Sequence, residues 1–312
     1  MTLRAETIDA LSRQLAEANQ RRHRVGDADL SALDRIVQYT PEDMTVTVQA
    51  GCRLAVLQAS LAAQRQWLPV DPAHPERITI ADLIQQNLNG PRRFGYGTVR
   101  DHLIGLRAAL PDGRVIRSGG QVVKNVAGYD LVKMFIGSRG TLGVVVEATF
   151  KLLPLPETES IRACDCDDPL VAAAVVRSVL ATHLAPVVLD LCSTKGRACR
   201  LVVALAGSRS QVAWQEQQCD TLGLAAPADL GHDTRFWEDA SPLPVRRWSM
   251  PPDRLADAIA TLEGREWIAR AGNGLLLYRG DPAPPGATLP RELMRRLKDT
   301  FDPNGILPPL PW

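Results

Sequence analysis

Apolar residues follow two different periods in the first half of the chain. They recur every three or four positions over residues 6–20 and again over 54–61, which predicts two helices. Residues 44–49, Met-Thr-Val-Thr-Val-Gln, alternate with a period of two and predict a strand. A Pro-Asp-Gly turn separates apolar runs at 103–110 and 114–116, and this arrangement predicts a β-hairpin. Helices and strands therefore mix in this half, as they do in an α+β fold.

A proline-rich segment, Pro154-Leu155-Pro156, divides the chain. We take it as a linker and expect one domain over residues 1–155 and a second over 156–312. Beyond the linker, periodicity predicts helices over 170–180, 211–222, 252–262 and 289–301, and strands over 186–191, 200–206, 245–249, 267–271 and 274–278. This order of strands and helices predicts a sheet covered by helices on one face, of the ferredoxin-like type.

The composition narrows the class of protein. A chain of 312 residues is long enough for two domains with separate cores. Its 36 basic and 35 acidic residues are spread along the sequence and give a net charge of +1, which argues against a nucleic acid partner. No run approaches the ~20 apolar residues that span a bilayer, and the first residues lack an apolar signal-peptide core. We expect a cytoplasmic protein that meets a membrane only through a partner.

The cysteine and histidine residues show no metal-binding spacing. The six cysteines are scattered without a Cys-x-x-Cys pair, which argues against a zinc ribbon or an iron–sulfur cluster. The five histidines form neither a His-x-x-His nor a His-Glu-x-x-His pattern. We therefore expect no metal site in this chain.

The segment 119–147 is unusually rich in glycine. A glycine-dense run costs chain entropy and is typical of backbone that turns sharply or touches a ligand closely. Residues 137–143, Gly-Ser-Arg-Gly-Thr-Leu-Gly, followed by three valines, predict a tight turn that leads into a strand and can direct several N–H groups at one ligand edge. The alternative is a plain strand–turn–strand corner. Neither a Walker loop nor a G-x-G-x-x-G dinucleotide turn is present.

Residues 124–154, KNVAGYDLVKMFIGSRGTLGVVVEATFKLLP, closely resemble the FAD-binding domain of the p-cresol methylhydroxylase and vanillyl-alcohol oxidase superfamily. The likeness is greatest to the small FAD-binding (E) subunits of glycolate oxidase and is dense over about residues 45–156. It implies an α+β fold in which a two-lobed FAD-binding domain of the p-cresol methylhydroxylase type, with a shortened N-terminal lobe, precedes a ferredoxin-like α+β domain.

The resemblance implies a set of residues around a flavin. In the family the glycine turn packs against the flavin ring, which suggests as ring neighbours Gly137, Ser138, Gly140, Thr141, Leu142, Gly143 and Val144. The matching motif makes another set a wall of the flavin site: Lys124, Asn125, Gly128 and Tyr129. Two of these have simpler interpretations, because Lys124 also fits a surface lysine and Tyr129 a buried tyrosine with a satisfied hydroxyl.

The two loops that hold the FAD pyrophosphate in this family are altered here. The first keeps only Gly26 and continues with Asp27 and Asp29. The second keeps Thr79 and its helix but has lost both glycines and gained Asp82, which stabilises the first turn of a helix and opposes a nearby phosphate.

Arg92 and Arg93 form a cationic pair beside the predicted cleft. A guanidinium group pairs with phosphate in fork geometry, so we expect Arg92 to offset the pyrophosphate charge. The alternative is a solvated surface pair.

The resemblance implies an FAD-binding subunit of a glycolate oxidase-like 2-hydroxyacid dehydrogenase complex. The flavin would carry the redox chemistry, and the partners would be a larger FAD-linked oxidase subunit and an iron–sulfur subunit. The small 2-hydroxyacid substrate would be met through the complex, since no acid–base constellation is visible and the catalytic residues are unknown. This favours an electron-transfer or accessory role over a stand-alone oxidase. The alternative is a flavin-free structural subunit with a degenerate pyrophosphate site.

Overall fold

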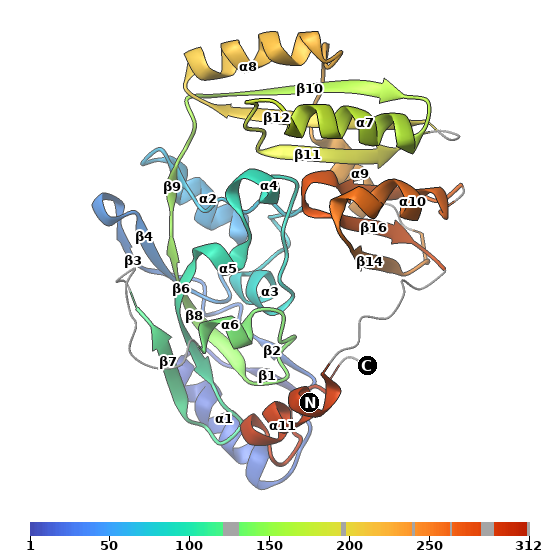
Figure 1. Ribbon diagram of the computed structural model, residues 1–312. Coiled ribbons are helices and arrows are strands. Elements are labelled where there is room, and N and C mark those ends of the chain that lie inside the picture. Colours follow the sequence, from blue (N-terminus) through green and yellow to red (C-terminus); the bar gives the residue numbers. More distant parts are fainter. Residues whose placement is uncertain (121–130, 195–197, 239–240, 263, 282–289, 311–312) are drawn as a thin grey trace.

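The computed structural model describes residues 1–120, 131–194, 198–238, 241–262, 264–281 and 290–310 (Figure 1). Two antiparallel sheets organise these residues. A five-stranded sheet has the order β3-β4-β8-β6-β7, and a seven-stranded sheet has the order β13-β10-β12-β11-β15-β16-β14.

The first sheet is built from residues before 152. Its strands are β3 (Ile36–Thr40), β4 (Thr45–Gln49), β6 (Leu103–Ala109), β7 (Val115–Gly119) and β8 (Val144–Lys151). The helices of this half are α1 (Ile8–Gln20), α2 (Leu54–Ala62), α3 (Ile80–Gln85), α4 (Arg93–Tyr96), α5 (Val99–His102) and α6 (Val132–Phe135). All five residues of β4 are buried, because β3 and β8 pair with its two edges and side chains cover both faces. The alternating pattern of this strand therefore marks a central strand with threonines inside. Thr47 and Thr149 share a buried hydroxyl hydrogen bond of 2.9 Å.

Two pairs of short strands complete this half. Strand β1 (Thr2–Arg4) pairs in parallel with β2 (Asp27–Asp29), and Leu3 joins the hydrophobic core. Farther along the chain, β5 (Gln66–Trp67) pairs with β9 (Leu153–Pro154). Proline 154 thus ends a strand of this half immediately before the chain moves to the second sheet.

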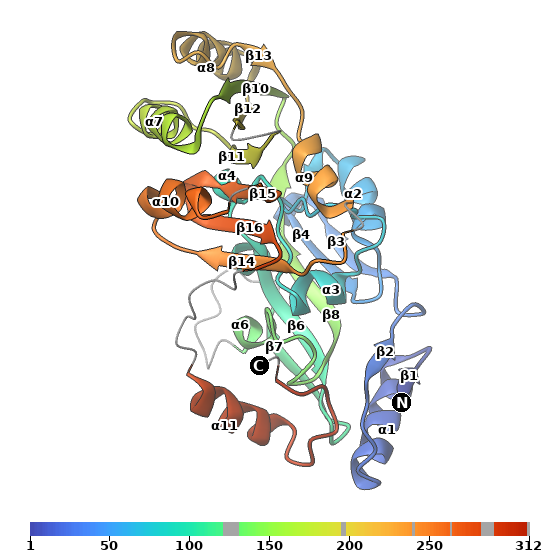
Figure 2. The ribbon, with the colours of Figure 1, turned by 90° about the vertical axis from the view of Figure 1, so that its right-hand side faces the viewer.

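The second sheet contains β10 (Thr158–Cys166), β11 (Val188–Ser193), β12 (Cys199–Gly207), β13 (Ala226–Pro227), β14 (Val245–Ser249), β15 (Trp267–Arg270) and β16 (Leu275–Arg279). The helices α7 (Pro169–Leu180), α8 (Arg209–Thr221) and α10 (Leu255–Ala260) share one core with one face of it, as Figure 2 shows. Helix α9 (Gly231–Glu238) lies on the other face, where Phe236 packs with Cys192 and Ile268. The three helices on one face agree with the prediction, whereas α9 on the other face was not predicted. The ferredoxin-like assignment and the division at residue 155 stay predictions.

The last described segment returns to the first half. Helix α11 (Arg291–Phe301) leads to Ile306 and Leu307, which are buried in the core of the five-stranded sheet. The amide of Val25 donates a hydrogen bond of 2.7 Å to the carbonyl oxygen of Ile306. Residues near both ends of the sequence therefore build the same lobe.

Helix α4 joins the two sheets. The amide of Gly95 donates to the carbonyl oxygen of Val187 at 3.1 Å, and a Cβ on Gly95 would lie 2.6 Å from the Cα of Val187. Glycine is therefore required at 95 for this close approach.

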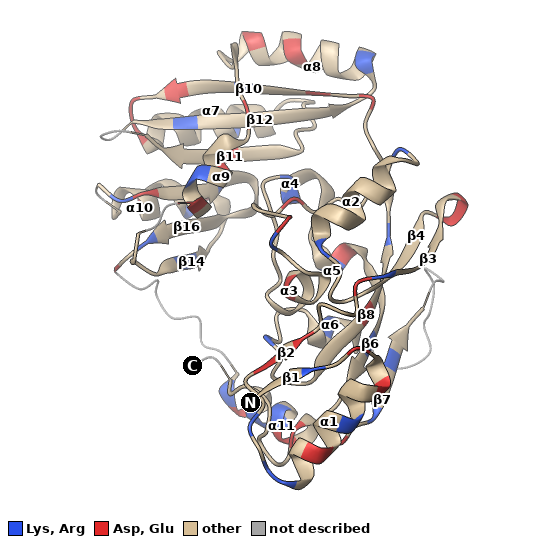
Figure 3. Ribbon diagram, turned by 180° about the vertical axis from the view of Figure 1, so that it is seen from behind, with Lys and Arg blue, Asp and Glu red and all other residues tan. Residues whose placement is uncertain are grey.

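Basic and acidic residues are interspersed over both halves (Figure 3). None of the helices in the described ranges combines the length and apolar character needed to cross a bilayer.

Candidate functional site

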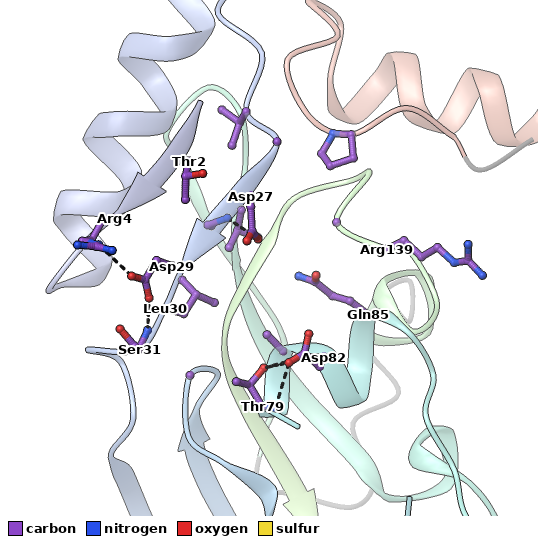
Figure 4. Close-up of a pocket in the computed structure, with 18 of the residues that line it drawn as sticks. Thr2, Arg4, Asp27, Asp29, Leu30, Ser31, Thr79, Asp82, Gln85 and Arg139 are labelled. Atoms are coloured by element: carbon purple, nitrogen blue, oxygen red, sulfur yellow. Dashed lines mark hydrogen bonds and ion pairs between the residues drawn. The ribbon is translucent and has the colours of Figure 1, made fainter. Parts of the chain in front are cut away.

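A cavity of about 720 Å³ opens between the N-terminal strand pair and the glycine turn (Figure 4). Its walls come from residues within 25–34, 51–56, 79–85 and 139–144, with Leu307 and Pro308 at its rim. The cleft therefore lies where four segments distant in sequence converge, and each segment contributes a different set of polar groups.

The loop after β2 forms the first wall. It lies against the end of β4, where a Cβ on Gly51 would be 1.8 Å from the carbonyl oxygen of Leu30, so that only glycine fits. The Asp27 carboxylate accepts a hydrogen bond from the amide of Ala28 at 2.8 Å. The Asp29 carboxylate accepts from the amide of Ser31 at 3.0 Å.

Asp29 is charged in this environment. Hydrogen bonds from Ser31 hold its pKa below the usual value, and the Arg4 guanidinium, 2.9 Å away, acts in the same direction. The first wall thus presents carboxylate oxygens to the cleft, and these oxygens already accept hydrogen bonds from amides of their own loop.

The second wall is the N-terminus of α3. Thr79 and Asp82 form a capping box in which the Asp82 amide donates to Thr79 Oγ1 and the Thr79 amide donates to Asp82 Oδ2, both at 3.1 Å. The amides of Ile80 and Ala81 donate to the carbonyl oxygens of Cys52 and Ala50 at 3.0 and 2.8 Å. Every amide from 79 to 82 has an acceptor within the protein, so this helix start offers no donor to a ligand.

The glycine turn forms the third wall and docks on the C-terminal end of α3. The amides of Gly137 and Arg139 donate to the carbonyl oxygens of Ile84 and Gln85, each at 2.9 Å, and the amide of Thr141 donates to Ser138 at 3.0 Å. The expectation that this turn directs several amides at a ligand is not realised at these positions. The amides of Gly137 and Arg139 fasten the turn to the helix, and the amide of Thr141 closes the turn itself.

Space beside the turn is nevertheless open at Gly140. This residue lines the cleft with a φ of +73°, and a Cβ built on it would contact only Gln85 Oε1, at 3.5 Å. Val144 lines the same wall. The backbone at Gly140 and the side chain of Val144 leave room for a flat ring system against this corner.

Apart from Arg92, the predicted cofactor residues divide into four groups. Thr79, Gly140 and Val144 line the cleft, whereas Gly137, Ser138 and Thr141 lie in the turn behind it. Leu142 and Gly143 face the core: Leu142 belongs to the hydrophobic cluster, and a Cβ on Gly143 would be 3.0 Å from the Ala109 carbonyl oxygen. The four residues of the KNVAGYD motif lie outside the described part of the chain: Lys124, Asn125, Gly128 and Tyr129.

Arg92 has a different environment from the one expected. Its guanidinium pairs with Asp71 at 3.0 Å and with Glu159 at 2.6 Å, and it does not line the cleft. Neither a pyrophosphate ligand nor a solvated surface pair describes this arrangement. Arg92 instead connects the two sheet-bearing halves of the molecule.

Sequence reasoning missed several polar residues of the cleft. Arg4, Arg53, Gln85 and Arg139 line it, together with Asp34. Arg53 donates to the carbonyl oxygen of Arg77, and Arg4 is paired with Asp29. Arg139 could have been suspected, because it stands between two glycines of the predicted turn.

The residues fit a flavin ring better than they fit a diphosphate. The corner at Gly140 has room for a ring, whereas the amides in the two loops that would meet a diphosphate are bonded to Asp27, Asp29 and the capping box. Within the described ranges, no group of three or more His, Cys, Asp or Glu residues is arranged to hold a metal ion.

Comparison with known proteins gives this cleft a family context. Residues 28–119 match the family described as FAD binding domain. The chain is 42% identical over 122 residues to glycolate oxidase subunit GlcE of Escherichia coli, covering 39% of this chain and 35% of that protein. It is 37% identical over 158 residues to glycolate oxidase subunit GlcD of Bacillus subtilis, covering 51% of this chain and 34% of that protein.

A further curated relative and a solved structure are also similar to this chain. A mitochondrial D-lactate dehydrogenase (cytochrome) of Arabidopsis thaliana is 34% identical over 137 residues, covering 44% of this chain and 24% of that protein. A solved structure of alkyldihydroxyacetonephosphate synthase superposes with a TM-score of 0.75 at 16% identity, over 98% of this chain and 75% of that one. The fold is therefore shared along almost the whole chain. The matches span only about a quarter to a third of the length of these curated relatives.

Proposed function

We propose, from the premise that this chain carries an FAD binding domain of the FAD-linked oxidase superfamily, that it is an FAD-binding accessory subunit of a 2-hydroxyacid dehydrogenase complex. The proposed complex is of the glycolate oxidase type, with a larger FAD-linked oxidase subunit and an iron–sulfur subunit as partners. The observation that carries the proposal is the position of the cleft, which opens between the matched segment 28–119 and Gly140.

The chain's own residues fit an electron-transfer or accessory role. A bound flavin would supply the capacity to accept and release electrons, and Gly140 and Val144 would form the wall against its ring. The described residues that line the cleft include no histidine, lysine or tyrosine, and Asp29 is held in its charged form. We assign substrate oxidation to the larger partner, because the cleft carboxylates of Asp27, Asp29 and Asp82 already accept hydrogen bonds from amides of the chain.

An absorption spectrum of the purified chain tests the proposed cofactor. We expect flavin bands that are released into solution on denaturation, or that appear after incubation with FAD. A colourless protein that takes up no flavin would contradict the proposal. Affinity purification from the native host tests the assembly, with co-purification of a large flavoprotein and a cysteine-rich iron–sulfur protein as the expected result.

A second candidate function is a flavin-free structural subunit of the same complex. The observation that favours it is the complete internal use of the amides at residues 79–82. A protein that assembles with its partners at normal stoichiometry, but contains no flavin before or after addition of FAD, would establish this second function.

A further inference from the structure

Three backbone donors in the two loops of the cleft are bonded to carboxylate oxygens of the chain itself. Ala28 and Ser31 donate to the carboxylates of Asp27 and Asp29. On the opposite wall the Thr79 amide donates to the Asp82 carboxylate, which also accepts from the Thr79 hydroxyl at 2.6 Å. An anion can therefore reach these amides only by displacing a carboxylate that is already bound.

The described side chains that line the cleft do not compensate for these occupied amides. Carboxylates of Asp27, Asp29, Asp34 and Asp82 line the cleft. Three guanidinium groups also line it, but Arg4 is paired with Asp29 and Arg53 is bonded to a carbonyl oxygen. Among the described residues of this cleft, Arg53 and Arg139 are therefore the cations without an ion-pair partner, and Arg53 is held by that carbonyl oxygen. A dianionic diphosphate would meet at least as much negative as positive charge here.

The corner at the glycine turn has the opposite character. Gly140 leaves open space, and Val144, Ala81 and Leu307 are apolar residues that line the same cavity. An uncharged, flat heterocycle can use this corner without displacing any hydrogen bond of the protein. The two ends of the cleft thus differ in the ligand chemistry that they favour.

We propose that this cleft selects the uncharged isoalloxazine-ribityl part of a flavin and gives no binding energy to the diphosphate, because Asp29 and Asp82 act as built-in competitors for the loop amides. This inference rests on the proposed flavin function and specifies its ligand class. It follows that riboflavin, FMN and FAD bind this chain with similar affinity. A protein that contacts the diphosphate holds FAD partly through those contacts, whereas the flavin affinity of this chain comes from contacts to the ring.

The test is a flavin-fluorescence titration of the full chain with riboflavin, FMN and FAD at physiological ionic strength. We expect the three dissociation constants to lie within about threefold of one another, which is less than the tenfold ratio that 1.4 kcal/mol of diphosphate contact would give. Raising the salt concentration should change all three little, because no phosphate contact is screened.

Variants locate the effect in the two carboxylates. In D29G/D82G the amides of Ser31 and Thr79 are released, and we expect FAD to bind at least tenfold more tightly while the riboflavin affinity stays within twofold. D82N is the conservative companion: it keeps an acceptor for the Thr79 amide but removes the charge, and it should give a smaller gain for FAD. D34N is the matched control, because Asp34 lines the same cleft but accepts no hydrogen bond from a loop amide. It should change the FAD affinity less than D82N does.

The outcomes separate this inference from the proposed function. Wild-type binding of FAD that is 100-fold tighter than binding of riboflavin would overturn the inference and leave the flavin function standing. Failure of every flavin to bind the wild type and all the variants, with circular dichroism showing folded protein, would overturn both. A wild type that binds no flavin and a D29G/D82G variant that binds FAD would support the built-in competition and favour the structural subunit.

Discussion

The ammonium group of Lys298 donates a hydrogen bond to the carbonyl oxygen of Thr141, 2.9 Å away across 157 residues of sequence. Lys298 also pairs with Asp302 at 2.6 Å, and the Asp302 carboxylate accepts from the amides of Ile306 and Leu307 at 3.0 and 2.9 Å. Both side chains are buried. One lysine therefore fastens helix α11 and the following loop to the glycine turn that forms a wall of the cleft.

Replacing this lysine should destabilise the protein. In Lys298→Met the Asp302 carboxylate loses its buried cationic partner, and removal of one member of such a pair costs about 3 kcal/mol of unfolding free energy. Urea denaturation followed by circular dichroism measures the loss. Arg295→Met, on the exposed face of the same helix, is the control and should change stability by less than about 0.5 kcal/mol. Equal effects of the two substitutions would show that the buried contact contributes nothing.

Asp71 should make the stability depend on pH. Burial raises its pKa to about 7, against the opposing influence of Arg92 and Arg270. The folded protein then binds a proton that the unfolded chain, with an ordinary carboxyl pKa near 3.8, has already released. The contribution of Asp71 is therefore fully present below about pH 4 and is lost as the pH rises to about 7, by an amount of order 4 kcal/mol.

The variant Asp71→Asn isolates this contribution. The variant should lack the dependence of unfolding free energy on pH that Asp71 causes. The difference in unfolding free energy between wild type and variant should therefore fall as the pH rises from about 4 to about 7. Urea denaturation at pH 4.5, 5.5, 6.5 and 7.5 provides the measurement. The exposed Asp253→Asn substitution is the control and should leave the pH profile of the wild type unchanged. A wild-type profile that rises from pH 4.5 to 7 relative to Asp71→Asn would contradict the raised pKa.

Arg92 should matter for the contact between the two halves. Its guanidinium bonds Asp71 of the first half and Glu159 of β10, so that Arg92→Ala leaves two partly buried carboxylates without their partner. We expect a loss of about 2 kcal/mol, and increased proteolysis of the segment near residue 155. Lysine can meet only one of the two carboxylates, so Arg92→Lys should recover part of the stability. Limited trypsin digestion and thermal denaturation give the two readouts. An unchanged cleavage rate would exclude Arg92 as a link between the halves.

Gly140 should be sensitive to any side chain. Its φ of +73° costs an L-residue about 1 kcal/mol, and an aspartate there also adds negative charge at the open corner. We expect Gly140→Asp to abolish flavin binding, measured as flavin absorbance after gel filtration. Gly223→Asp is a matched control, since its φ is +78° with no atom within 4 Å of a built Cβ and it does not line the cleft. Unchanged flavin occupancy in Gly140→Asp would place the ring elsewhere.

Buried Arg270 holds together the face of the second sheet that α9 covers. Its guanidinium nitrogens bond the carboxylates of Asp190 and Asp233, and Asp190 also contacts His232 Nε2 at 3.0 Å. Arg270→Met should cost about 4 kcal/mol of unfolding free energy, because two buried carboxylates lose their cation. Arg270→Met combined with Asp190→Asn and Asp233→Asn should recover part of that loss. Failure of the triple variant to exceed the single variant in stability would contradict this account.

Periodicity predicted the strongly amphipathic elements well. The helix over 6–20, the hairpin at 103–116 and the paired strands near 267–278 all occur, with ends shifted by a few residues. These segments bury a regular stripe of apolar side chains, which leaves a signal in the sequence itself. Strand β10 escaped prediction because only Ala163 and Cys166 are buried along it, although it pairs with β12 over its whole length. Helix α9 escaped because a long-range ion pair, Asp233 with Arg270, fixes it.

The site was less predictable than the fold. The lost glycines and new aspartates are visible in the sequence, but the acceptors of the loop amides are not, because Cys52 and Ala50 reach Ile80 and Ala81 only in the folded chain. Arg92 shows the same limit. Its partner Glu159 lies 67 residues away, beyond any local pattern.

The backbone hydrogen bond between Val25 and Ile306 also determines the order in which parts of this protein can fold. Residues 302–307 leave the ribosome long after β8 has been synthesised, so the lobe that contains the cleft stays without Ile306 and Leu307 while the second sheet emerges. Nascent chains usually complete their first domain early. Here the first half, which is synthesised early, cannot complete its core until Ile306 and Leu307 have been synthesised. The cleft therefore takes its final shape only after translation has passed Leu307.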